Sequence, residues 1–249
     1  MLQSKKVIPA INVQSEAENI LKNATADGKK VLTETDGAPL LRSWKIPVAN
    51  SFLAHTPEEA AKRASECGYP VVLKVASEHI LYKTDVGGVF LNINSAEDLL
   101  TAYKRIIENV SRSMPEAFIN GILVEKQISG GEEIILGIKR DPSFGPVVMC
   151  GIGGIFTEIY RDVSFRIAPF GEEEGEAMVK ELKAYPLLAG ARGRAKRDIS
   201  SLIKTLVSLS HLAFAHPLIA ELDINPLIVQ DEDKGCMAAD VKILLTNNS

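Results

Sequence analysis

The chain has 249 residues, of which 46% are hydrophobic and 24% charged, and its net charge is −4. This composition is ordinary for a soluble globular protein of one large or two small domains, and the charge gives no electrostatic reason to expect nucleic acid or an anionic membrane as a partner. No apolar run approaches the roughly 18 residues of a membrane helix, and residues 1–19 lack the apolar core of a secretory signal. The cysteines show no CxxC spacing and the histidines no metal-ligand spacing, so we expect a cytoplasmic protein with reduced thiols.

The first half of the chain predicts a tail followed by alternating helices and strands. Residues 1–30 mix polar and apolar positions and indicate a peripheral tail with one short helix. Thr33 with Asp36 three residues later fits a capping box, and Thr56 followed by Pro57 fits a helix start. The elements expected here are helices over 33–44, 56–68 and 95–110 and strands over 71–75 and 89–93.

Past Pro115 the pattern favours strands. The elements expected are strands over 122–128, 133–138, 147–150 and 163–167, helices over 173–184 and 198–215, and a closing hairpin over 221–240. Strand pairs interleaved with helices predict an α+β protein. We place its two lobes at 31–125 and 126–249, joined near 125–131, after the tail of residues 1–30.

The closing hairpin carries the most informative pattern. Glu221, Asp223 and Asn225 alternate with apolar residues, so their oxygen-bearing side chains share one strand face. If the acidic turn 231–234 has four residues, Asn225 faces Asp240 across the hairpin. Oxygen ligands in this arrangement suit Mg²⁺, which usually shares its coordination with water and substrate phosphates. The pattern therefore indicates nucleotide chemistry, although a solvated strand face also fits it.

Lys74 is the one charged residue in the apolar strand 71–75. A buried lysine is costly unless an anion pairs with it. Lys74 thus points into a cleft toward phosphate, which we favour, or reaches water from an edge strand. The nearby loop 83–89 holds Lys83, Gly87 and Gly88, and its glycines would let backbone N–H groups approach phosphate oxygens. A plain hairpin turn also fits this loop.

Two further segments offer groups that suit a nucleotide. Glu125, Lys126 and Gln127 lie where one lobe would pass to the other, and a strand edge there would offer backbone groups to an adenine. Arg192 stands in the glycine-flanked loop 190–193, and an arginine in such a loop suits a phosphate group. The alternatives are an ordinary surface strand and a solvent-exposed turn.

The glycine loop 151–154 is not a dinucleotide-binding fingerprint, because Phe156 occupies the third glycine position. A GxxxxGK[ST] phosphate loop is absent as well. The common dinucleotide and phosphate-loop folds are therefore disfavoured. The loop leads toward Glu158, Asp162 and Arg166, a charged set that either faces the cleft or forms a salt-bridged strand surface.

Taken together, these segments resemble the ATP-grasp beta-type subunit of ADP-forming acyl-CoA synthetases, often called ADP-forming acetate–CoA ligases. The resemblance covers roughly residues 30–245 in order, and its 29-residue central block is long and specific. The matching stretches are GYPVVLKVAS at 68–77, KTDVGGV at 83–89, DPSFGPVVMCGIGGIFTEIYRDVSFRIAP at 141–169, AYPLLAGARG at 184–193 and ELDINPL at 221–227.

The resemblance implies an ATP-grasp fold, in which two α+β lobes hold a nucleotide site between them. It implies the reversible reaction acyl-CoA + ADP + phosphate ⇌ carboxylic acid + ATP + CoA, with ATP or ADP and Mg²⁺ as the bound groups. In the family, a separate alpha-type region binds CoA and carries a phosphohistidine that brings the phosphoryl group to the nucleotide. Nothing in this sequence matches that region, so the resemblance implies a CoA-binding partner subunit and a hetero-oligomer.

The patterns and the resemblance together assign roles to individual residues. Catalytic roles are predicted for Lys74, Lys83, Asp162 and Arg192. Nucleotide contacts are predicted for Lys74, Gly87, Gly88, Glu125, Lys126 and Gln127, with Glu133 as a ribose contact. The predicted Mg²⁺ ligands are Asn225 and Asp240, with Asp223 or Glu221 as a supporting acid.

One position departs from the family pattern. Related chains often read LHKTD or VHKSD where this chain has LYKTD at 81–85, and the family histidine has been proposed as a second phosphoryl carrier. Tyr82 stands in its place here, and His79 would substitute for it only if the loop is helical. We therefore expect direct transfer from the partner's phosphohistidine or an impaired synthetase reaction.

Two other functions fit the same residues. One is a succinyl-CoA synthetase beta chain, but the block at 141–169 resembles the acetate-type family more. The other is a non-catalytic nucleotide-sensing module, which only the departure at Tyr82 favours. The presence of Lys74, Asn225 and Asp240 argues against such a module, because a scaffold needs no metal ligands.

Overall fold

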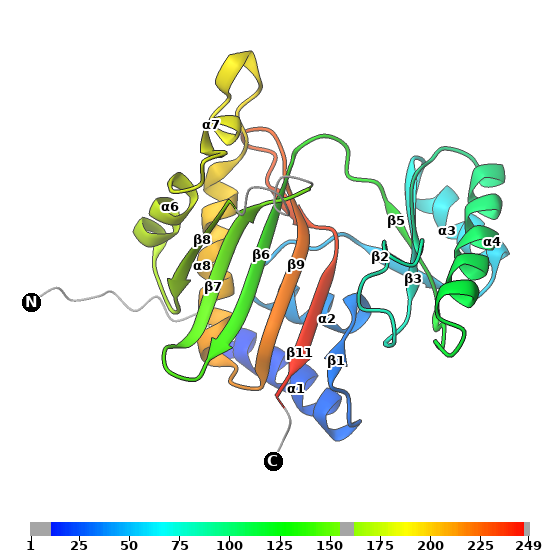
Figure 1. Ribbon diagram of the computed structural model, residues 1–249, viewed down its shortest axis with the longest axis horizontal. Coiled ribbons are helices and arrows are strands. Elements are labelled where there is room, and N and C mark those ends of the chain that lie inside the picture. The colour runs from blue at the N-terminus through cyan, green and yellow to red at the C-terminus, as the bar shows by residue number, and fades with distance from the viewer. Residues whose placement is uncertain (1–10, 155–161, 247–249) are drawn as a thin grey trace, which may run out of the picture. The chain divides into compact units, whose positions relative to one another are not determined.

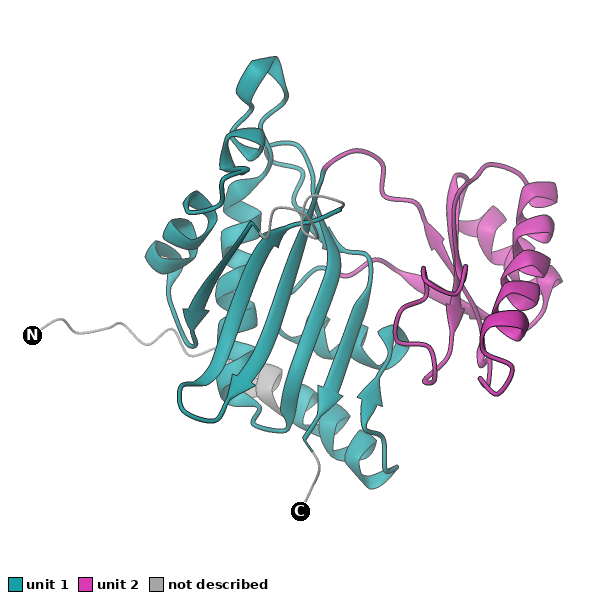
Figure 2. Ribbon diagram, in the orientation of Figure 1, with its two compact units in different colours: residues 1–47, 132–249 teal, residues 48–131 magenta. Residues whose placement is uncertain are grey.

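The structure, a computed structural model, describes residues 11–154 and 162–246. The chain forms two compact units (Figure 2), of which unit 1 comprises residues 1–47 and 132–249 and unit 2 comprises residues 48–131. Each unit mixes helices with a sheet, which confirms the predicted α+β class.

Unit 2 is an antiparallel sheet with two helices packed on it. Its elements are β2 (Ser51–Ala54), α3 (Pro57–Cys67), β3 (Val71–Ala76), β4 (Val89–Ile93), α4 (Ala96–Ser113) and β5 (Gly121–Lys126). The strands lie in the order β2-β5-β3-β4 among the described residues. Leu73 and Val75 of β3 pack with Leu99 and Ile106 of α4 in the core. Alternate residues of β3, Lys74 among them, therefore point to the sheet face away from the helices.

Unit 1 is built on a larger antiparallel sheet. Its strands, in the order β1-β11-β9-β6-β7-β8 with β10 paired to β9, are β1 (Val31–Leu32), β6 (Glu132–Asp141), β7 (Gly145–Ile152), β8 (Val163–Ile167), β9 (Ile219–Val229), β10 (Cys236–Ala238) and β11 (Val241–Leu245). Its helices are α1 (Ile11–Ala26), α2 (Glu34–Ser43), α6 (Glu172–Lys180), α7 (Tyr185–Leu188), the 3-10 turn η1 (Ala191–Gly193) and α8 (Ile199–Ala215).

The two faces of the unit 1 sheet differ. In Figure 1, α1, α2 and α8 lie behind the sheet, and this helix-covered face is buried. The strands alternate accordingly: Ile134, Leu136 and Ile138 of β6 are buried, whereas Lys139 is exposed. The face opposite the helices is where polar side chains of β9 can meet a ligand.

The units differ from the predicted lobes 31–125 and 126–249. β1 pairs with β11, with Val31 opposite Leu244 and Leu32 opposite Ile243. Residues 31–47 therefore belong to unit 1. The sequence did not predict this, because a strand pairing that is remote in the sequence leaves no local signal. The predicted tail 1–30 contains the one helix expected there, α1, which buries Leu21 and packs against α2.

Helix starts follow the predicted caps with one exception. The side chains of Thr56, Ser95 and Asp198 each accept a hydrogen bond from the backbone amide three residues further on. Thr33 makes no such bond, so the capping box predicted at the start of α2 is wrong. Its hydroxyl contacts the hydroxyl of Thr35 at 3.0 Å instead.

In the parts of the chain that the structure describes, no helix has an apolar stretch long enough to cross a bilayer. The three cysteines are free thiols, with Cys150 and Cys236 buried and Cys67 half-buried. Burial raises the pKa of Cys150 to about 12, and the nearby Asp162 carboxylate adds to the effect. Cys150 is therefore an unreactive core residue at neutral pH.

Trp44, the single tryptophan of the chain, is paired with a buried histidine in unit 1. Its Nε1 donates a hydrogen bond to Nε2 of His216 at 3.2 Å, and the two rings meet edge to face. Because Nε2 accepts, the neutral ring carries its proton on Nδ1. Burial lowers the pKa of His216, and the charge of Glu18 opposes this effect.

We expect the protein to lose stability as the pH falls below about 6.5, the ordinary pKa of histidine. The unfolded chain takes up a proton at His216 there, whereas the folded chain does so only below its lowered pKa. The stability that neutral His216 contributes is fully present above that pH. As the pH falls below it, the free energy of unfolding decreases by at most about 1.4 kcal/mol per pH unit for one proton. Urea midpoints followed by Trp44 fluorescence should show a weaker pH dependence in His216→Gln, and an unchanged dependence would contradict this assignment.

Candidate functional site

The hairpin of β9, β10 and β11 places oxygen-bearing side chains side by side. Asp223 lies opposite Lys242, and the amide of Asn225 donates to the carbonyl of Asp240 at 3.2 Å, which confirms the predicted register. Asp223 is half-buried and Asn225 exposed, whereas Ile224 between them is fully buried on the helix side. Asp223, Asn225 and Asp240 are referred to below as the hairpin oxygen cluster.

The hairpin oxygen cluster offers two carboxylates and an amide, a donor set that suits a hard divalent cation. Burial raises the pKa of Asp223, Lys242 opposes this effect, and the charge of Asp240 adds to it. The two carboxylates thus repel each other, a cost that a bound cation would relieve. No three His, Cys, Asp or Glu side chains gather as a metal site in the described residues. Further ligands would therefore come from water and substrate phosphates.

Lys74 and Glu125 form a buried ion pair in unit 2. The ammonium group donates to Oε2 of Glu125 at 2.7 Å, and the two residues are 6% and 2% exposed. β3 lies between β5 and β4, so the edge-strand alternative for Lys74 is wrong. Among the described residues, Oε1 of Glu125 makes no hydrogen bond. The pair therefore keeps one buried acceptor that suits a donor group of a ligand.

The turn 83–88 is closed by its own backbone. The amides of Gly87 and Gly88 donate to the carbonyls of Thr84 and Lys83 at 3.0 and 2.7 Å. A Cβ atom on Gly88 would lie 2.6 Å from Val75, so glycine is required by close packing. In this conformation the two amides are used within the turn, and they do not provide the predicted phosphate contact.

The other predicted nucleotide contacts have varied surroundings. Lys126 donates to the carbonyls of residues 68 and 69 at 3.0 and 2.6 Å, which ties the end of β5 to the loop before β3. The side-chain amide of Gln127 exchanges two hydrogen bonds with Asn92. Glu133 in unit 1 is exposed. The hydrogen bonds of Lys126 and Gln127 fix the backbone of this segment. Its backbone groups are the ones predicted to face an adenine.

The side chain of Asp162 binds the backbone of the segment that follows α6. It is buried, and its two carboxylate oxygens accept hydrogen bonds from the amides of Lys183 and Ala184 at 2.7 and 2.8 Å. Both oxygens are engaged where the chain leaves α6. This placement explains the charge at position 162 without the predicted catalytic role. Glu158, which was predicted to lie near it, falls outside the described residues.

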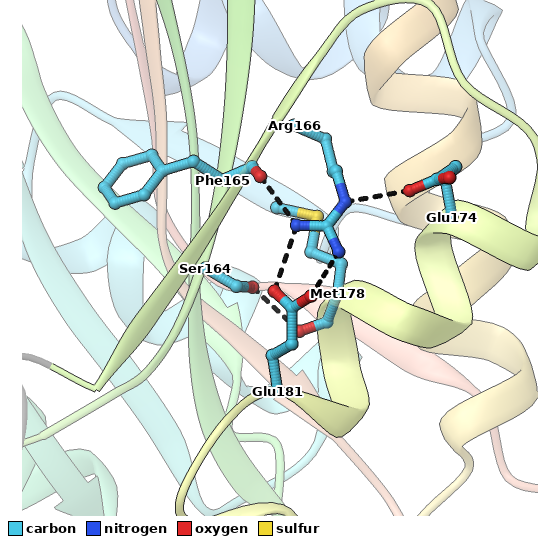
Figure 3. Close-up of polar contacts among 6 residues, drawn as sticks. All are labelled: Ser164, Phe165, Arg166, Glu174, Met178 and Glu181. Atoms are coloured by element: carbon cyan, nitrogen blue, oxygen red, sulfur yellow. Dashed lines mark hydrogen bonds and ion pairs between the residues drawn. The ribbon is translucent and has the colours of Figure 1, made fainter.

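Arg166 belongs to a salt-bridged surface. Figure 3 shows its guanidinium group between Glu174 and Glu181, at 2.9 and 2.5 Å. It also donates to the carbonyl of Phe165 in the same strand at 2.8 Å. Of the two interpretations of Arg166, the structure favours the salt-bridged strand over a residue that faces the cleft. Arg166 fastens β8, the edge strand of the sheet, to α6.

Arg192 lies at the surface in a loop of residues 189–197, referred to below as the Arg192 loop. Its backbone has φ 58°, in the left-handed region, between Gly190 and Gly193, which also have positive φ values. The side chain is exposed, and it makes no hydrogen bond or ion pair with any residue that the structure describes. Arg192 is therefore placed by its loop, and its guanidinium group is available to an anion.

Tyr82 and His79 lie in a loop that is not helical, so the condition for His79 to replace the family histidine is not met. Nδ1 of His79 accepts a hydrogen bond from the amide of Phe118 at 3.0 Å. The neutral ring therefore carries its proton on Nε2. Tyr82 is 63% exposed.

The fold agrees with comparisons to known proteins. The ATP-grasp domain family matches residues 23–245. The beta subunit of ADP-forming acetate–CoA ligase I from Pyrococcus furiosus is 40% identical over 231 residues, which cover 93% of this chain and 98% of that subunit. This chain belongs to the ATP-grasp beta-type subunits of ADP-forming acyl-CoA synthetases. The predicted family and the predicted ATP-grasp fold are confirmed.

Further relatives and a solved structure extend this comparison. ADP-forming acetate–CoA ligase I of Archaeoglobus fulgidus is 42% identical over 236 residues, and this chain spans 34% of its length. Acetyl-coenzyme A synthetase 1 of Ca. Korarchaeum cryptofilum, solved with coenzyme A and Ca-AMPCP, has a TM-score of 0.88 and 44% identity over 92% of this chain and 100% of that one. The ADP-forming succinate–CoA ligase beta subunit of Natronomonas pharaonis is 27% identical over 208 residues.

Proposed function

We propose that this chain is the nucleotide-binding part of an ADP-forming acyl-CoA synthetase, which interconverts acyl-CoA, ADP and phosphate with carboxylic acid, ATP and CoA. The observation that carries this proposal is the hairpin oxygen cluster, in which Asn225 faces Asp240 and Asp223 lies beside them. Membership of the beta-type family supports the reaction class. The lower identity to the succinate–CoA ligase subunit favours the acetate-type ligases over the succinate type.

The chain would act with a partner that binds CoA and carries a phosphohistidine. The Archaeoglobus fulgidus relative supports this, because this chain matches 34% of its length and other functions would lie in the remainder. The Pyrococcus furiosus relative is itself a beta subunit. In one structure of the Korarchaeum synthetase, solved with coenzyme A and Mg-AMPPCP, the phosphohistidine segment points toward the nucleotide-binding site. We therefore propose a cytoplasmic hetero-oligomer with an alpha-type subunit.

In the proposed step, the bond between phosphorus and the partner's histidine nitrogen breaks as a β-phosphate oxygen of ADP bonds to that phosphorus. Such transfer depends on positioning and on stabilisation of negative charge. Mg²⁺ held by the hairpin oxygen cluster would offset the charge of the phosphates. Lys74 would donate to the phosphates while Glu125 holds its ammonium group in place. Arg192 would approach the transferred group from its exposed loop.

Other residues complete the proposed nucleotide contacts. Lys126 and Gln127 would act through the backbone that their own hydrogen bonds hold, and Glu133 would bind the ribose. Lys83 would add positive charge near the phosphates. The turn with Gly87 and Gly88 would cover the phosphates only after its internal hydrogen bonds open.

The proposal is tested by mixing the purified chain with an alpha-type CoA-binding subunit, acetyl-CoA, ADP, phosphate and Mg²⁺. Formation of ATP in amounts that depend on acetyl-CoA and on both subunits would support it. The same assay with succinyl-CoA tests the succinate alternative. Binding of Mg-ADP without any ATP formation would instead favour a nucleotide-sensing module.

We expect His79→Ala to keep the full turnover of the reconstituted enzyme. His79 accepts a hydrogen bond from the Phe118 amide, and its loop is not helical, so it is not poised to carry phosphate. Rapid-quench measurements with labelled phosphate should find no phosphohistidine on this chain. A large loss of turnover in His79→Ala, with unchanged binding of Mg-ADP, would revive the carrier role. Tyr82→His, which restores the family residue, is the companion variant for comparison.

A further inference from the structure

We infer that Arg197 is a positioning residue that holds the Arg192 loop to the turn between β9 and β10. The inference rests on the proposed role of Arg192. The Arg197 side chain is 11% exposed, and its guanidinium group binds two carboxylates. Nη1 donates to Asp231 at 2.5 Å, and Nη2 donates to Glu132 at 3.2 Å. These acids lie in different elements, since Glu132 begins β6 and Asp231 lies in the turn between β9 and β10.

Backbone hydrogen bonds at the same place close the Arg192 loop. The amide of Arg197 donates to the carbonyl of Leu188 at 2.8 Å, which joins the two ends of the loop. The amide of Glu232 donates to the carbonyl of Lys196 at 2.9 Å, which fastens the loop to the β9–β10 turn. In Figure 1, the yellow segment after α7 projects beyond the end of the sheet. The loop is therefore held at its base and extends from there.

The Arg192 side chain has no hydrogen-bond or ion-pair partner among the described residues, so none of their side chains holds it directly. Its position therefore depends on how firmly the base is held. Arg197 joins that base to the turn that follows β9, and β9 carries Asp223 and Asn225 of the hairpin oxygen cluster. A guanidinium group bound to two acids is a stiff connection, since its donors form a planar fork. Arg197 thus sets the distance between Arg192 and the proposed metal site.

Removing Arg197 would leave neither acid without a partner. Arg194 remains on Glu132 at 2.9 Å, and Lys234 remains on Asp231 at 3.1 Å. The fold should therefore tolerate the change, while the base of the loop loosens. Loss of the Arg197 side chain should therefore affect the placement of Arg192 more than the folding of the chain.

The test measures ATP synthesis by the reconstituted enzyme in Arg197→Gln, Arg192→Gln and the double variant. We expect Arg197→Gln to lower kcat by about 10- to 100-fold, as a displacement of about 1 Å can do, with little change in the KM for Mg-ADP. The double variant should match Arg192→Gln alone, because Arg197 acts through Arg192. Glu132→Gln, which weakens the same connection from β6, should also lower kcat, and it keeps the test valid if Arg197→Gln fails to fold.

Arg166→Gln is the matched control, since it also removes an arginine that joins two carboxylates in unit 1. We expect it to keep kcat. If Arg197→Gln lowers kcat by the same factor with and without Arg192, the two residues act independently and the inference is overturned. If Arg192→Gln has no effect on kcat, the role proposed for Arg192 fails, and the positioning role fails with it. Binding of Mg-ADP, measured separately, shows whether the wider proposed function survives.

Discussion

Lys74→Met is expected to lower phosphoryl transfer by about 100- to 1000-fold and the free energy of unfolding by about 3–5 kcal/mol. The first effect follows from the loss of a cation that would bind the nucleotide phosphates. The second follows because Glu125, which is 2% exposed, would stay buried without its partner. Turnover of the reconstituted enzyme and urea unfolding of the chain measure the two effects separately.

The double variant Lys74→Met with Glu125→Met separates folding from function. Replacing both members of a buried ion pair with apolar residues of similar size is often nearly neutral for stability. We therefore expect the double variant to regain most of the lost free energy of unfolding. Its rate of phosphoryl transfer should stay as low as that of Lys74→Met. Lys180→Met, which breaks an exposed pair with Glu176, is the control and should change little. A double variant that regains activity would show that Lys74 has a structural role alone.

Asp240→Asn is expected to lower turnover at least about 100-fold and to remove the effect of Mg²⁺ on ADP binding. The change takes one negative charge from the hairpin oxygen cluster and keeps a side-chain oxygen that can accept the hydrogen bond from the Val241 amide. The charge of Asp240 raises the pKa of Asp223, so the variant also relieves repulsion between the two acids. Without metal, the variant should therefore be at least as stable as the native chain.

Thermal unfolding with and without Mg-ADP checks this prediction, because a ligand that binds the folded state alone raises its stability. The native chain should gain stability with Mg-ADP and Asp240→Asn should gain little. Asp141→Asn is the control, since Asp141 is the last residue of β6 and accepts hydrogen bonds from the amides of residues 143 and 144 in the turn that follows. Equal stabilisation of all three proteins by Mg-ADP would rule out Asp240 as a metal ligand.

The hairpin was predictable because local rules determine it. The period of two in a strand puts Asp223 and Asn225 on one face, and the four-residue turn 231–234 pairs Gln230 with Gly235 and brings Asn225 opposite Asp240. The helix caps at Thr56 and Ser95 are equally local. The resemblance to a known family then assigned a chemical meaning to a pattern that also fitted a solvated strand face.

Partnerships that depend on strand order were not predictable in the same way. Lys74 was expected to need an anion, but its pairing with Glu125 requires β5 to lie beside β3. Asp162 was assigned to a cleft because it follows the glycine loop, whereas amides 21 and 22 residues away bind it. Arg197 was overlooked because its acids come from the start of β6 and the end of β9. These groups come together only when the strands and helices of each unit have assembled.

Calorimetric titration of the purified chain with ADP, with and without Mg²⁺, shows whether this chain binds a magnesium nucleotide. We predict binding that strengthens markedly with Mg²⁺, because the hairpin oxygen cluster would hold the metal against the nucleotide phosphates. Absence of binding at millimolar ADP in the presence of Mg²⁺ would contradict it, and so would binding that Mg²⁺ leaves unchanged.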